Sequence, residues 1–138
     1  MFAHTFWIVP GVKETKALST LIQNHPNFKE FEVVNIAGDG DEEKPYNEAL
    51  ALVRSSIKSY PKTITISCEK LTTGVTVREW TAIMRLSGSA STSATGYMQA
   101  IFRVQSPGYI NDKQKQNCYV FDFAPDILEP YTHMKKQL

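Results

Sequence analysis

The chain has 138 residues, of which 42% are hydrophobic and 21% are charged, and this is the size of one globular domain with an ordinary core. Its 15 Lys and Arg residues nearly balance its 14 Asp and Glu residues, so the net charge of +1 provides no global field that would draw the protein onto nucleic acid or a membrane. Any contact with DNA must therefore be local.

The two cysteines, Cys68 and Cys118, do not lie beside histidines at metal-ligand spacing. The sequence therefore indicates neither a disulfide framework nor a zinc site, and it fits a reducing compartment. The hydrophobic run at 6–9 is too short for a signal peptide or a membrane span. We expect one cytoplasmic domain that covers residues 1–138.

Strand-like and helix-like patterns alternate along the chain. Runs of β-branched and aromatic residues predict strands, and apolar residues spaced three or four apart predict helices. In chain order, the expected elements are a strand at 4–9, a turn at Pro10-Gly11, a helix at 12–22, a strand at 31–36, a polar loop at 37–44, a helix at 46–57, strands at 63–67 and 80–86, a short helix at 97–104, a strand at 118–123 and a helix at 126–136.

This alternation predicts an α/β fold with a mostly parallel sheet covered by helices on both faces. In such sheets, ligands bind outside the carboxyl ends of the strands. Three features fall at that edge, namely the Pro10-Gly11 turn, the loop after Ser67 and the Ser-rich loop after Leu86. We expect the functional chemistry there.

Two segments, LTTGVTVREW (71–80) and QAIFRVQSP (99–107), resemble motifs of the C-terminal RecA-like domain of superfamily-two helicases and translocases. The first is similar to the fifth helicase motif and the second to the sixth, whose usual pattern is Q-x-x-G-R-x-x-R. The Pro10-Gly11 turn is similar to the fourth motif. The resemblance covers essentially the whole chain in element order and looks most like the restriction-modification branch, the subunits of type III and type I restriction enzymes. It implies a three-layer α/β/α RecA-like fold, related to the P-loop NTPases.

The resemblance implies hydrolysis of ATP in a cleft between two RecA-like domains, coupled to stepping along DNA. Gln99 and Arg103 would face the nucleotide as catalytic and nucleotide-binding residues. Both side chains can reach one ligand because they are four residues apart on one helix face. The Arg103 guanidinium would stabilise charge on the transferring phosphoryl group. Gly74 would lie at the same interdomain cleft and permit close backbone approach.

The resemblance also implies contacts with the nucleic-acid backbone. Thr72 and Thr73 would supply hydroxyl groups, which suit phosphate oxygens. Pro10 and Gly11, in the turn after the first strand, would contact the same backbone.

The sequence departs from the family pattern in the sixth motif, where Phe102 replaces the usual glycine and Ser106 replaces the last arginine. The chain also lacks a G-x-x-x-x-G-K-[ST] phosphate loop and an acidic box that would hold magnesium. We therefore expect the chain to be inactive as an ATP hydrolase by itself and to be part of a longer polypeptide. ATP and Mg would be bound mainly by an N-terminal RecA-like motor domain.

Two functions stay open at this point. The first is the C-terminal motor domain of a DNA helicase or translocase from a restriction-modification system, favoured by the Thr-Thr-Gly motif and the order of strands. The second is a non-catalytic module that binds nucleic acid or a protein through the same surface, favoured by the altered sixth motif. The expected partners are the N-terminal motor domain and DNA, with nuclease or methyltransferase domains or subunits also possible, and no membrane.

Overall fold

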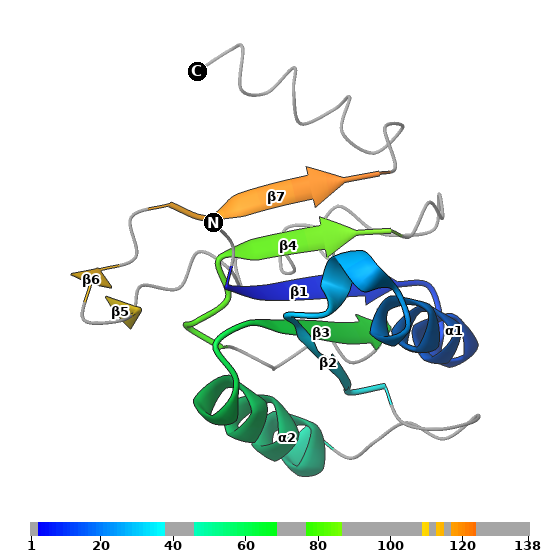
Figure 1. Cartoon of the computed structure of the whole chain (residues 1–138), viewed down its shortest axis with the longest axis horizontal. Coiled ribbons are helices and arrows are strands. Elements are labelled where there is room, and N and C mark those ends of the chain that lie inside the picture. The colour runs from blue at the N-terminus through cyan, green and yellow to red at the C-terminus, as the bar shows by residue number, and fades with distance from the viewer. Residues whose placement is uncertain are drawn as a thin grey trace.

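The computed structural model describes residues 3–37, 46–68, 77–86, 109–110, 113–114 and 117–123, and its elements are shown in Figure 1. These elements are, in chain order, β1 (His4–Val9), α1 (Val12–Gln23), the 3-10 helix η1 (Pro26–Phe28), β2 (Glu32–Asn35), α2 (Tyr46–Ser59), β3 (Thr63–Cys68), β4 (Ala82–Arg85), β5 (Tyr109–Ile110), β6 (Lys113–Gln114) and β7 (Tyr119–Asp122). The helices expected at 97–104 and 126–136 lie outside the described residues. In the part of the chain that the structure describes, no helix has the length and apolar character needed to cross a membrane.

Five strands form one sheet in the order β2-β3-β1-β4-β7, and every neighbouring pair is parallel. The short strands β5 and β6 form a separate antiparallel pair that the sequence patterns did not predict. Helices flank the parallel sheet (Figure 1). The predicted α/β fold with a parallel sheet is therefore confirmed.

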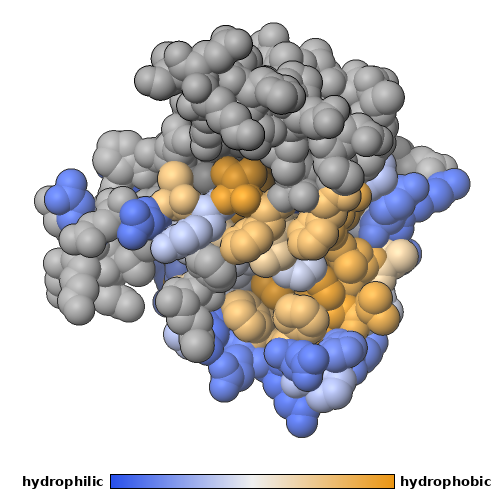
Figure 2. Space-filling model, turned by 90° about the horizontal axis from the view of Figure 1, so that it is seen from above, coloured by the Kyte–Doolittle hydropathy of each residue, from blue (hydrophilic) through white to orange (hydrophobic). Residues whose placement is uncertain are grey.

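One face of the sheet packs against α1. Trp7 and Val9 of β1 lie on this face in one hydrophobic cluster with Ile22 of α1. The hydroxyl groups of two buried residues of α1 find hydrogen-bond acceptors within the helix. The Thr15 hydroxyl donates to the Val12 carbonyl (2.6 Å), and the Ser19 hydroxyl donates to the Thr15 carbonyl (2.7 Å). Hydrophobic residues also reach the surface beside this layer (Figure 2).

The opposite face of the sheet packs against α2. Phe6 and Ile8 point to this side because successive side chains of a strand alternate between faces. They share a second hydrophobic cluster with Ala49 and Val53 of α2. All six residues of β1 are buried because both of its faces are covered, which explains its continuous apolar run.

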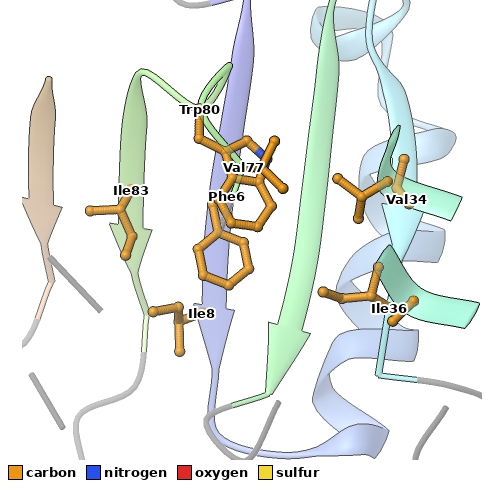
Figure 3. Packing of buried hydrophobic residues seen from close by; sticks show 9 residues of the cluster. Phe6, Ile8, Val34, Ile36, Val77, Trp80 and Ile83 are labelled. Carbon is orange, nitrogen blue, oxygen red and sulfur yellow. The ribbon is translucent and has the colours of Figure 1, made fainter. Parts of the chain in front are cut away.

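The described end of the β3–β4 connection, with Val77 and Trp80, packs on the α2 face of the sheet. The connection from β1 through α1 runs to β2 at one edge of the sheet. The connections that follow β2, β3 and β4 all run in the opposite direction across the strand order. Right-handed crossovers place such opposed connections on opposite faces. Trp80 accordingly packs on the α2 face, stacked on Phe6 (Figure 3). The expected strand start at residue 80 is therefore wrong, because Trp80 belongs to the crossover and β4 begins at Ala82.

Candidate functional site at the carboxyl edge of the sheet

The carboxyl ends of β1 and β4 lie side by side, with Ile8 paired to Arg85. From the end of β1 the chain runs to β2, which lies beyond β3 at one edge of the sheet. From the end of β4 the chain continues to β7, which lies at the other edge. In α/β sheets, ligands commonly bind at the point where two neighbouring connections diverge in this way. The candidate site is therefore the carboxyl edge of the sheet between the Pro10-Gly11 turn and the end of β4.

The Pro10-Gly11 turn places the start of α1 at this edge of the sheet. Pro10 is exposed, and Gly11 is the N-cap residue with extended backbone angles (φ −159°, ψ 174°) that any residue adopts. The Gly11 carbonyl accepts the Thr15 N–H (3.1 Å), which begins the helix. The first N–H groups of a helix have no partner within it, and Gly11 offers no capping side chain, so this terminus suits an anion.

The carboxylate of Glu14 lies over the same turn. A Cβ atom placed on Gly11 would be 2.5 Å from Glu14 Oε2, so this side chain fills the space that a larger residue would need. Its negative charge stabilises the helix terminus. A phosphate group that approached Gly11 would meet this carboxylate first. The predicted DNA contact at Pro10 and Gly11 stays a prediction, with the helix terminus in its favour and the Glu14 charge opposing it.

Arg85 is a buried charge at the end of β4, with only 3% of its surface exposed. Arg85 lies on the α2 face, because two neighbours that share its side of the sheet belong to the cluster on that face. They are Ile8, which is paired with Arg85 across the strands, and Ile83, two residues earlier in β4. Its other neighbour in the sheet is Asp122 of β7. A buried arginine is rare and needs charged or polar groups around it.

The sequence reasoning missed Arg85 as a candidate site residue. The signal was present, since Arg85 is the one charge in the apolar strand pattern WTAIMRL at 80–86. Arg85 was predicted only as a residue of the strand at 80–86, because a single charge does not disturb a hydrophobic pattern. Among the described strands of the parallel sheet, Arg85 is the one Lys or Arg residue, and it lies at the end of β4 beside the end of β1.

The end of β3 reaches the same edge. Ser67 and Cys68 are buried there, and the Ser67 hydroxyl donates to the Cys68 carbonyl (3.1 Å). Cys68 is a free cysteine. The chain leaves this edge after Cys68 towards Thr72, Thr73 and Gly74, which lie outside the described residues, as do Gln99 and Arg103.

The structure thus brings the carboxyl ends of β1, β3 and β4 to one edge, as expected. The roles of the residues outside the description stay predictions. Within the described ranges, no three His, Cys, Asp or Glu side chains group in a way that could hold a metal ion.

The fold defines the class of the protein as an α/β domain with a five-stranded parallel sheet. No protein-family model matches the chain. The chain is 34% identical over 125 residues to a protein of Mycoplasma pneumoniae whose name assigns it as the C-terminus of a type II restriction enzyme and methyltransferase. The match includes 87% of the chain but only 17% of that relative. The expected relation to restriction-modification proteins is confirmed, and the helicase assignment stays a prediction.

Proposed function

We propose that the chain is the C-terminal motor domain of an ATP-dependent DNA helicase or translocase in a restriction-modification protein. The observation that carries the proposal is the meeting of three strand ends at one edge. In the sequence, Pro10-Gly11 follows β1 and the segment with Thr72 to Gly74 follows β3. The segment with Gln99 and Arg103 comes after β4 and before β7 in the sequence. The similarity to part of a restriction protein supports the biological setting.

In this proposal, ATP and Mg are held by an N-terminal RecA-like domain and meet this domain across a cleft. Arg103 contributes its guanidinium to the charge that develops on the transferring phosphoryl group, and Gln99 orients the nucleotide. The described edge fits a phosphate-rich ligand in one respect, the N-terminus of α1. Glu14 opposes such a ligand and must turn away when one binds there.

The DNA contacts of the proposal are made with the sugar-phosphate backbone. Thr72 and Thr73 donate hydroxyl hydrogen bonds, and Gly74 lets the backbone approach closely. Phosphate contacts carry no sequence information, so they allow a motor to step along any duplex. Sequence recognition would then belong to other parts of a restriction protein.

The test is DNA-stimulated ATP hydrolysis by the complete polypeptide that carries this domain. Replacing Arg103→Ala is expected to lower kcat by about 10³-fold or more, as for other arginine fingers. Arg54→Ala is the matched control, because Arg54 is an exposed residue on α2. Equal rates for the two variants would remove Arg103 from the catalytic residues.

The second candidate function, a non-catalytic binding module, is favoured by Phe102 and Ser106 in the sixth motif. It predicts that Thr72→Ala and Thr73→Ala weaken DNA binding while Arg103→Ala leaves ATP hydrolysis unchanged. Thr20→Ala, on the exposed side of α1, serves as the control for both threonines. Loss of hydrolysis in Arg103→Ala would favour the motor.

A further inference from the structure

We draw no further inference here: the strongest candidate, the surface patch made by the exposed side chains of Tyr119, Phe121 and Phe123 on and just after the edge strand β7, carries no proposal because nothing in the structure shows what covers it.

Discussion

The indole ring of Trp80 lies flat on the phenyl ring of Phe6, with centroids 4.2 Å apart and an angle of 7° between the planes (Figure 3). Both side chains are fully buried. Phe6 belongs to the central strand β1, whereas Trp80 belongs to the connection that brings the chain from β3 to β4. The stacked pair therefore holds the crossover against the sheet and helps to set where β4, and with it Arg85, lies.

The Trp80 pair predicts a large loss of stability on truncation. Trp80→Ala should lower the free energy of unfolding by about 3–5 kcal/mol, because it removes a buried aromatic ring and leaves a cavity above Phe6. Chemical denaturation of the purified chain measures this change. Tyr60→Ala, which truncates an exposed aromatic residue, should change stability by about 0.5 kcal/mol or less. Similar losses for both variants would contradict the structural role of the pair.

Replacing Thr65 should increase the stability of the fold. Its buried hydroxyl finds no hydrogen-bond partner in the described structure. Thr65→Val keeps the shape of the side chain and removes the desolvated hydroxyl, so the free energy of unfolding should rise by about 1–3 kcal/mol. Thr15→Val is the matched opposite, because the buried Thr15 hydroxyl donates to the Val12 carbonyl (2.6 Å) and its loss should cost about 1 kcal/mol. Thermal unfolding of both variants should show shifts of opposite sign.

His4 predicts a dependence of stability on pH. Burial lowers the pKa of His4 below its ordinary value of 6.5, and the nearby Glu79 carboxylate partly offsets this shift. The unfolded chain therefore takes up a proton near pH 6.5 that the folded chain takes up only at lower pH. The contribution of His4 is complete above about pH 6.5 and is lost as the pH falls towards the lowered folded pKa.

The variant His4→Asn should reduce this pH dependence. The Asn amide can replace the His4 Nδ1 in its hydrogen bond with the Thr63 hydroxyl (2.9 Å) but cannot titrate. Free energies of unfolding, measured from about pH 5 to about pH 8, should therefore change less steeply than in the wild type. His25→Asn, at an exposed position, is the control variant. An unchanged slope in His4→Asn would assign the pH dependence to other groups.

Glu14 predicts a change in DNA affinity if the start of α1 contacts a phosphate group. Glu14→Gln removes a negative charge over the Gly11 turn, so DNA binding by the complete polypeptide should tighten by about two- to fivefold at fixed low salt. Glu30→Gln is the charge-matched control at the opposite edge of the sheet, where Glu30 pairs with Lys62. Equal effects of the two variants would indicate a general charge effect and no contact at Gly11.

The periodicity of side chains predicted most of the described elements. The bounds of β1 agree with the expected strand at 4–9, and α1 and α2 begin at the expected residues 12 and 46. These segments are long or have a strong pattern of apolar residues. The secondary structure that their residues prefer locally is therefore also the one that buries their apolar side chains. The pair β5 and β6 was missed because two-residue strands carry no periodic signal. The 3-10 helix η1 was missed because it has only three residues and follows the end of α1 closely.

The sequence by itself determined the class of fold, the alternation of strands and helices, and the strand ends where a ligand site would form. These follow from side-chain periodicity and turn residues, which act over a few neighbouring positions. Only the tertiary structure decided that β1 lies between β3 and β4, that Trp80 covers Phe6, and that Arg85 is buried at the end of β4. The physical reason is that strand order and register depend on how distant segments share one core, and no local pattern encodes that choice.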